Sequence, residues 1–270
     1  MKQTAPFKVA AVQMVSGPSI EANLAAAGEL IAQAAAQGAR LVALPENCAI
    51  LGMTERDKLA ARERDGDGPI QDFLSQQSAR HGIWLVAGSV PLECGDPGKV
   101  RASCLVFDER GLRAARYDKI HLFGFAAEGE RYDEAATIEP GSVPVAIDSP
   151  FGRLALSICY DVRFPELYRG LGEIDIILVP SAFTATTGRA HWETLLRARA
   201  IENLAYVLAP AQGGRHPGGR ETHGHSMIVD PWGTVLACLP EGPGAVIAEV
   251  DPAFQRRMRE SLPALQHRTL

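Results

Sequence analysis

The sequence predicts an α/β fold in which two packed sheets carry helices on their outer faces. Three observations lead to this prediction. The chain opens with strand, helix and strand patterns in succession, an order typical of a sheet covered by helices. Further along, some apolar runs are joined by tight turns, as in hairpins, and others are separated by helical segments, which together favour two sheets. With 270 residues and no linker, repeat or low-complexity tract, we expect a single domain over residues 1–270.

The opening elements show how the pattern indicates strands and helices. Phe7–Met14 is a short apolar run typical of a buried strand. Ser19 is a candidate N-cap for an alanine-rich helix over Ile20–Gln37, which Gly38 ends. Arg40–Leu44 is the next apolar run and therefore the second predicted strand.

The rest of the chain continues to alternate between strands and helices. The further predicted strands are Ile83–Val90, Arg101–Asp108, Leu112–Tyr117, two within Pro144–Ile158, Asp175–Pro180, and those near Ala205–Gln212, Ser226–Asp230, Thr234–Cys238 and Ala245–Val250. Two further helices are expected, one from Pro69 to about His81 and one over His191–Asn203. Gly213–His223 is rich in glycine and charge, which predicts an exposed loop.

Composition and charge argue against several classes of protein. A hydrophobic fraction of 46% is typical of globular proteins, and a net charge of −5 argues against general binding to nucleic acid. No apolar run reaches the ~18 residues of a membrane span, and Lys8 interrupts the apolar stretch that a signal peptide would need. The five cysteines are odd in number and lack CxxC spacing, which disfavours a disulfide framework or a zinc site. We therefore expect a cytoplasmic protein with reduced thiols and no nucleic-acid or membrane partner.

Three polar residues follow apolar strands and are candidates for one site. Glu46, Lys119 and Cys159 each come at or just after the end of a predicted strand. In α/β proteins the carboxyl ends of strands gather at one crevice, so these side chains can converge although 73 and 40 positions separate them. Together they offer a base, a positive charge and a nucleophile, which is the set of groups needed to cleave an amide.

Each of these residues also has a simpler interpretation. Cys159 could be a small core residue, and Glu46 and Lys119 could be surface charges. A reactive thiol is favoured because Phe164-Pro165 is typical of a helix start, and a helix N-terminus just after the cysteine would promote its thiolate form.

With these residues identified, the sequence resembles the nitrilase, or carbon–nitrogen hydrolase, superfamily. The resemblance covers nearly the whole chain and depends on Leu44–Glu46, Tyr117–Leu122 and Cys159–Leu167, with support from Gln13, Gly224–Ser226 and Asp230–Gly233. The resemblance implies a four-layer α-β-β-α sandwich of the nitrilase type that forms a homodimer through its α faces. It also implies that no metal and no organic cofactor is needed.

The resemblance assigns a role to each candidate residue. It implies that Glu46 is the general base, Lys119 stabilises the oxyanion and Cys159 is the nucleophile, with the backbone N–H of Tyr160 completing the oxyanion site. The family also has a second active-site glutamate before a Pro-Gly pair. Glu134 fits best, because Pro140-Gly141 follows it, while Glu128 and Glu130 remain alternatives that can also be surface charges.

Within the superfamily, the chain is most similar to the branch of deaminated glutathione amidases. Segments that resemble this branch are Ser181–Phe183, Thr187–Gly188, Ala190–Glu193, Leu195–Glu202 and Ala211–His216. The likeness implies an amidase that cleaves the primary amide of a small carboxylate-bearing substrate and releases ammonia. Gly124–Glu130 departs from the branch, which leaves three alternatives open: an ω-amidase acting on α-ketoglutaramate or α-ketosuccinamate, another nitrilase-type or N-carbamoyl hydrolase, and an inactive relative that binds a partner.

Several residues are candidates for binding the substrate. Arg163 can hold a carboxylate with two hydrogen bonds, although a structural salt bridge with Asp161 or Glu166 is an alternative. Phe183 and Thr187 are further pocket candidates.

Three histidines, His191, His223 and His225, have no cysteine or carboxylate at a suitable interval, so we predict no metal ligand among them.

Overall fold

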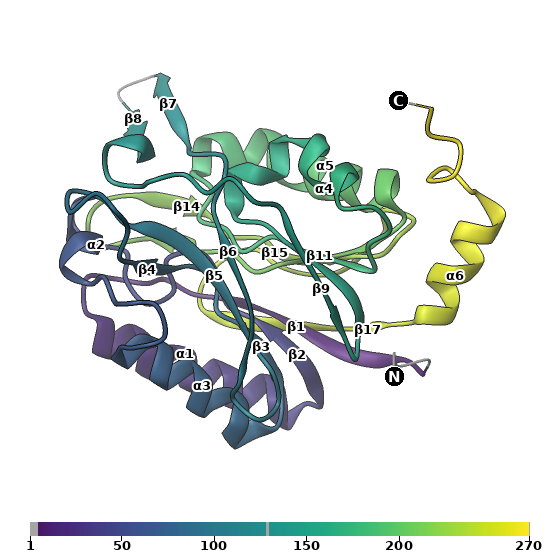
Figure 1. Ribbon diagram of the computed structural model, residues 1–270, viewed down its shortest axis with the longest axis horizontal. Helices are drawn as coiled ribbons and strands as arrows, with labels where there is room; N and C mark the ends of the chain where they lie inside the picture. The colour runs from purple at the N-terminus through teal and green to yellow at the C-terminus, as the bar shows by residue number, and fades with distance from the viewer. Residues whose placement is uncertain (1–4, 128–129, 270) are drawn as a thin grey trace.

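The computed structural model describes residues 5–127 and 130–269, which form four layers. Figure 1 shows α1 (Ile20–Ala36) and α3 (Pro69–His81) on the outer side of one sheet, and α4 (Pro165–Gly170) and α5 (Ala185–Asn203) on the outer side of the other. The predicted α-β-β-α sandwich is therefore confirmed.

The two central sheets are both mixed. The seven-stranded sheet runs in the order β17-β1-β2-β3-β5-β4, with β6 also paired to β5. Its strands are β1 (Phe7–Gln13), β2 (Ala39–Ala43), β3 (Trp84–Val86), β4 (Val90–Leu92), β5 (Arg101–Phe107), β6 (Arg113–Asp118) and β17 (Gly244–Val250). The six-stranded sheet runs in the order β16-β15-β12-β11-β10-β9. Its strands are β9 (Val145–Ser149), β10 (Gly152–Leu156), β11 (Ile176–Leu178), β12 (Tyr206–Ala209), β15 (Ser226–Val229) and β16 (Val235–Leu239).

The core lies on both faces of the seven-stranded sheet, which explains its near-continuous apolar strands. In β1, Val9 and Ala11 face the core that is shared with the six-stranded sheet. Ala10 and Val12 face the core beneath α1, where they pack with Ile31. Side chains of a strand alternate between its faces, so a strand buried on both sides must be apolar at every position.

Helix α1 begins where the sequence predicts. The hydroxyl of Ser19 accepts a hydrogen bond from the N–H of Ala22 at 3.3 Å, which satisfies one of the free amides of the first turn. Leu30, Ile31 and Ala34 are buried against the seven-stranded sheet, as the helical spacing requires.

The predicted strand over Ile83–Val90 is wrong, because two strands, β3 and β4, occupy this segment. The break lies at Gly88, which has a φ of +66°. A Cβ atom at this position would lie 1.9 Å from the carbonyl oxygen of Pro45. The sequence alone does not reveal this contact with a distant segment, and only glycine permits both the φ value and the close approach.

The exposed loop predicted over Gly213–His223 is present only in part, at residues 217–219. The segment forms a hairpin of β13 (Gly213–Arg215) and β14 (Glu221–His223), and His216 between them is 2% exposed. The ring of His216 lies 2.7 Å from the hydroxyl of Thr222 and 2.8 Å from the carbonyl oxygen of Ser16. These contacts hold the hairpin against the N-terminal part of the chain.

Several smaller elements differ from the prediction or were missed. Helix α5 begins six residues before the predicted start, where Thr184 caps it by accepting the N–H of Thr187. Weak helix formers, two threonines and a glycine, hide this first turn in the sequence. The missed elements are α2 (Asp57–Ala60), α6 (Pro252–Ser261), η1 (Glu134–Ala136), η2 (Cys159–Arg163), β7 (Gly124–Ala127) and β8 (Glu130–Asp133).

In the part of the chain that the structure describes, no helix combines the length and apolar character needed to cross a bilayer.

Candidate active site

The three predicted residues come from both sheets and meet where the sheets face each other. Glu46 lies just beyond β2 and Lys119 directly follows β6, so both extend from the seven-stranded sheet. Cys159 begins η2 beyond β10 of the six-stranded sheet. The predicted convergence at strand ends is therefore present, and it joins two sheets rather than one.

A buried cluster of charges forms the base of the site. The Nζ atom of Lys119 lies 2.7 Å from Oε1 of Glu46 and 2.8 Å from Oε2 of Glu134, and the lysine side chain is 0% exposed. Burial disfavours the charge on this lysine, but the carboxylates of Glu134 and Glu46 outweigh it and hold the pKa of Lys119 well above its usual value. The ammonium is therefore a fixed positive charge in the site.

Backbone amides fix both carboxylates in place. Oε2 of Glu46 accepts the N–H of Ala182 at 2.9 Å, and Oε2 of Glu134 accepts the N–H of Phe123 at 2.7 Å. Glu134 therefore stands where the sequence suggested a second glutamate. Of the alternatives, Glu128 lies outside the described residues, and Glu130 is described only as the first residue of β8.

Cys159 has a backbone conformation that is uncommon for a residue with a side chain. Its φ is +50°, and its N–H donates to the carbonyl oxygen of Pro180 at 2.9 Å. The next residue, Tyr160, precedes the first backbone hydrogen bond of η2, which runs from Asp161 to Ile158. The N–H of Tyr160 therefore lies in the first turn of η2, where backbone N–H groups have no acceptor within the helix.

The surroundings of Cys159 do not favour its thiolate form at rest. Burial raises the pKa of the thiol well above its usual value, the charge of Glu46 raises it further, and the opposing effect of Lys119 is smaller. The helical turn that follows, η2, is short and has only five residues. The thiol is therefore neutral at rest and requires a base before it can attack.

Asp161 connects the segment that carries Lys119 to the segment that carries Cys159. Its carboxylate is 0% exposed and accepts the hydroxyl of Tyr117 at 2.7 Å and the N–H of Ile158 at 2.9 Å. The backbone N–H of His121 lies 3.0 Å from its other oxygen, and the imidazole Nδ1 lies 2.7 Å from the same atom. One buried carboxylate therefore sets the relative position of the two segments.

We expect Asp161→Asn to cost about 2–4 kcal/mol of unfolding free energy and at least about tenfold in kcat. The side-chain NH₂ of the new asparagine cannot accept a hydrogen bond, so the N–H or O–H groups that now donate to one oxygen of Asp161 would lose their acceptor. Urea denaturation and steady-state kinetics measure both effects, and Asp148→Asn, at a carboxylate that is 88% exposed, is the matched control. Wild-type stability in Asp161→Asn would contradict this account of the network.

A narrow pocket of about 10 Å³ opens beside the thiol. The side chains that bound it include Glu46, Glu134, Cys159, Arg163, Phe183 and Thr187. The substrate-binding candidates of the sequence are thus in its wall. Phe123 and Arg220 also line the pocket and were missed. Arg220 lies in the segment predicted as a loop, and no sequence signal distinguishes it from a surface arginine.

Among the described residues, Arg163 contacts aromatic rings, and the alternative of a salt bridge with Asp161 or Glu166 is not found. Its guanidinium carbon lies 5.2 Å from the ring centre of Phe183 and 5.6 Å from that of Tyr160. Its two terminal nitrogens lie 3.3 Å from Nδ1 of His191. Its Nε is buried, and no partner for it is found among the described residues. The guanidinium thus keeps hydrogen-bonding capacity for an anionic group in the pocket.

Within residues 5–127 and 130–269, no group of three or more His, Cys, Asp or Glu side chains is arranged to hold a metal ion.

Comparisons with known proteins find relatives of this chain. A family model described as carbon–nitrogen hydrolase matches residues 8–260. The chain is 46% identical to a Synechocystis protein named deaminated glutathione amidase, over 97% of this chain and 98% of that protein.

Solved structures also resemble this chain. The Caenorhabditis elegans NitFhit protein, a nitrilase and fragile histidine triad fusion, gives a TM-score of 0.89 at 38% identity, over 99% of this chain and 66% of that chain. A mutant amidase from Nesterenkonia sp. AN1 gives a TM-score of 0.79 at 28% identity, over 95% of this chain and 98% of that one. Its structure shows the result of Michael addition of acrylamide at its active-site cysteine.

Proposed function

The chain belongs to the carbon–nitrogen hydrolase family, and we propose that it acts on deaminated glutathione through a thioester on Cys159. As a member of this family it is a hydrolase of carbon–nitrogen bonds other than peptide bonds, and its substrates are small amides. The observation that supports the proposed mechanism best is geometric: the buried Cys159 lines one pocket with Glu46 and Glu134, and both of these carboxylates contact Lys119.

The first half of the reaction forms the thioester. The carboxylate of Glu46 takes the proton of the Cys159 thiol, and the sulfur attacks the amide carbon. The ammonium of Lys119 and the N–H of Tyr160 stabilise the oxyanion. The protonated Glu46 then gives its proton to the departing nitrogen, and the carbon–nitrogen bond breaks.

The second half releases the acid. Glu46 takes a proton from water, the resulting hydroxide attacks the thioester, and the carbon–sulfur bond breaks as the thiol is regenerated. Glu134 is a positioning residue, because it holds Lys119 and takes no proton. In this scheme the raised pKa of the thiol requires that proton removal and attack are coupled through Glu46.

The expected release of ammonia does not fit deaminated glutathione, because its amide is not a primary amide. Deaminated glutathione is an α-keto acid whose γ-carbonyl is joined to cysteinylglycine, so the amide that is cut is secondary and the leaving group is a dipeptide amine. Ammonia leaves only from primary amides such as α-ketoglutaramate. Both substrates form the same α-ketoglutaryl thioester, and Arg163 is our candidate for holding its carboxylate.

We expect a higher kcat/KM for deaminated glutathione than for α-ketoglutaramate. The substrates share their acyl group, so one assay of the α-keto acid product serves both, and Cys159→Ala supplies the blank. A preference for α-ketoglutaramate would identify an ω-amidase, and activity on neither would refute the proposed substrate class.

We propose further that the protein is a homodimer, as its family resemblance implies, and that it is cytoplasmic, as its composition and cysteine pattern suggest. The support lies beside α5, where Ile201 is 46% exposed and Trp232, in the turn next to it, is 57% exposed. Light scattering that returned the 29.0-kDa monomer mass would contradict the dimer.

A further inference from the structure

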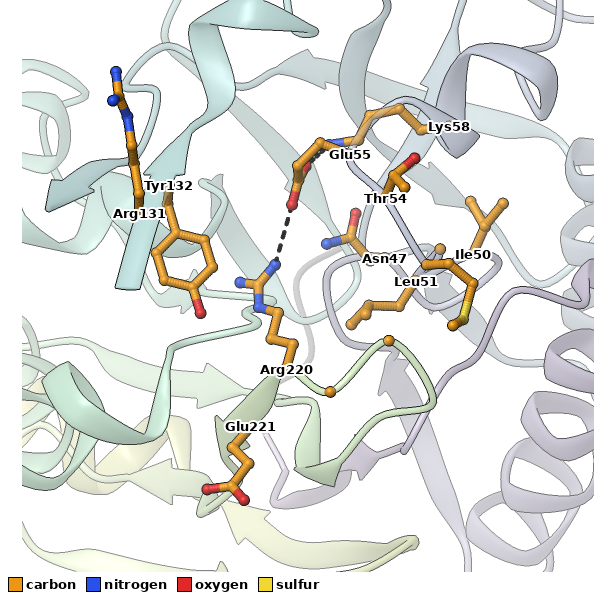
Figure 2. Close-up of a pocket in the computed structure, with 14 residues that line it drawn as sticks. Asn47, Ile50, Leu51, Thr54, Glu55, Lys58, Arg131, Tyr132, Arg220 and Glu221 are labelled. Atoms are coloured by element: carbon orange, nitrogen blue, oxygen red, sulfur yellow. Dashed lines mark hydrogen bonds and ion pairs between the residues drawn. The ribbon is translucent and has the colours of Figure 1, made fainter. Parts of the chain in front are cut away.

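A second, open cavity lies directly outside the active-site pocket, and Arg220 borders both. We call it the outer cavity; its polar lining includes Asn47, Glu55, Lys58, Tyr132, Arg220 and Glu221. Figure 2 shows the guanidinium of Arg220 extending into the cavity toward Glu55, with the ring of Tyr132 on one side and the amide of Asn47 on the other.

The size of the inner pocket makes a second site necessary for a long substrate. The pocket beside Cys159 has only about 10 Å³, far below the ~300–1,000 Å³ typical of small-molecule sites. Because Cys159 lines it, the reacting acyl carbon of an amide substrate must lie there. A peptide-sized leaving group must extend beyond it, and Arg220 marks the common border with the larger outer cavity of about 510 Å³.

The charges of the outer cavity suit an anionic group. Three cations line it against two carboxylates, Lys58, Arg131 and Arg220 against Glu55 and Glu221. Glu55 is already engaged, because Nζ of Lys58 lies 2.6 Å from one of its oxygens and Arg220 lies 3.7 Å from the other. Burial raises the pKa of Glu55, but Lys58 and Arg220 lower it more, so this carboxylate is ionised. Its negative charge lies beside Arg220, where an anionic group of a substrate could bind instead.

Arg220 itself is only partly satisfied. It donates to the carbonyl oxygen of Ala182 at 2.8 Å, and its guanidinium lies 5.2 Å from the ring centre of Tyr132. Its Nε is buried and has no partner among the described residues, and its contact with Glu55 is too long for a hydrogen bond. An arginine that is fixed in position and still has a free donor is suited to bind a carboxylate.

We propose that the outer cavity is a leaving-group subsite, in which Arg220 binds the terminal carboxylate of a peptide-like leaving group such as cysteinylglycine. This inference rests on the proposed function, and it assigns the two halves of the substrate to two cavities. Glu55 serves as the partner of Arg220 until the substrate carboxylate replaces it.

The test compares three substrates that form the same thioester: deaminated glutathione, its C-terminal amide and α-ketoglutaramate. In Arg220→Gln, we expect the ratio of kcat/KM for deaminated glutathione to that for α-ketoglutaramate to fall by about tenfold or more. With the wild-type enzyme, the kcat/KM for the C-terminal amide should be lower than that for deaminated glutathione by a similar factor. Arg220→Gln should not lower the kcat/KM for the C-terminal amide further, relative to α-ketoglutaramate. Glu55→Gln should lower the KM for deaminated glutathione, because it removes the competing carboxylate.

Arg215→Gln is the matched control, since Arg215 is an exposed arginine of the same hairpin that lines neither cavity. An unchanged ratio in Arg220→Gln, or equal turnover of deaminated glutathione and its C-terminal amide by the wild-type enzyme, would overturn the subsite and leave the amidase function standing. Should Arg220→Gln fail to fold, an unchanged KM in Glu55→Gln would overturn it as well. Turnover of α-ketoglutaramate alone would instead refute the proposed substrate.

Discussion

The Cys159→Ser variant is expected to lose turnover by at least about a thousandfold while keeping its fold. A serine hydroxyl is a far weaker acid than a thiol, so the Glu46 carboxylate can no longer generate an effective nucleophile. Because the native thiol is neutral at rest, a neutral hydroxyl of similar size leaves the charges of the buried cluster unchanged. Steady-state kinetics measure the loss of turnover, and circular dichroism shows whether the fold is kept.

Mass spectrometry adds a direct readout of the same prediction. Acid-quenched wild-type enzyme should carry the α-ketoglutaryl group on Cys159, and the serine variant should carry none. Cys94→Ser is the control, since Cys94 is a partly exposed thiol outside the active-site pocket. Wild-type turnover in Cys159→Ser, or an acyl group on another cysteine, would contradict the assignment of the nucleophile.

Glu46→Gln is expected to have two opposite effects, on turnover and on the reactivity of the thiol. Turnover should fall by about 10³-fold, because the amide cannot take the thiol proton, protonate the leaving nitrogen or activate water. The pKa of Cys159 should fall, because the charge of Glu46 is one of the causes that raise it. The sign follows from electrostatics: a negative charge opposes formation of a thiolate, and removing it favours the thiolate.

Alkylation by iodoacetamide as a function of pH tests this prediction without turnover. The midpoint of the alkylation profile should move to lower pH in Glu46→Gln, so the inactive variant should be alkylated faster than the wild type at neutral pH. Glu193→Gln, at an exposed carboxylate, should leave the midpoint in place. A midpoint that stays or rises would show that Glu46 does not act on the thiol.

Features that depend on local sequence were predictable. Glu46 and Cys159 could be found because each follows an apolar run, and the end of such a run is visible without knowledge of the fold. Lys119 follows a more polar predicted strand, and the resemblance of Tyr117–Leu122 to the family identified it. The start of α1 was predictable for a similar reason, since Ser19 directly precedes the helix and accepts the N–H of Ala22 only three positions on. Glu134 needed more than the sequence, because only the structure shows its contact with Lys119.

Features that depend on distant contacts were not predictable. The break at Gly88 is set by the carbonyl of Pro45, and the hairpin at residues 213–223 is buried by a contact between His216 and Ser16, 200 positions away. The pKa of Cys159 belongs to the same class, since the charge of Glu46 reaches the thiol from the other sheet. Arg220 was missed because its importance comes from the two cavities that it separates.

The pairing of β17 with β1 has a consequence for how the protein is made. All seven residues of β1, near the start of the chain, pair with β17, whose last residue is Val250. During synthesis on the ribosome, β1 therefore emerges long before its partner and stays an open sheet edge until β17 has been translated. Glu46, Lys119 and Cys159 have all emerged by then, but the sheet that carries two of them is still incomplete. A nascent chain released before β17 would expose that edge to other chains, which is the usual route to aggregation.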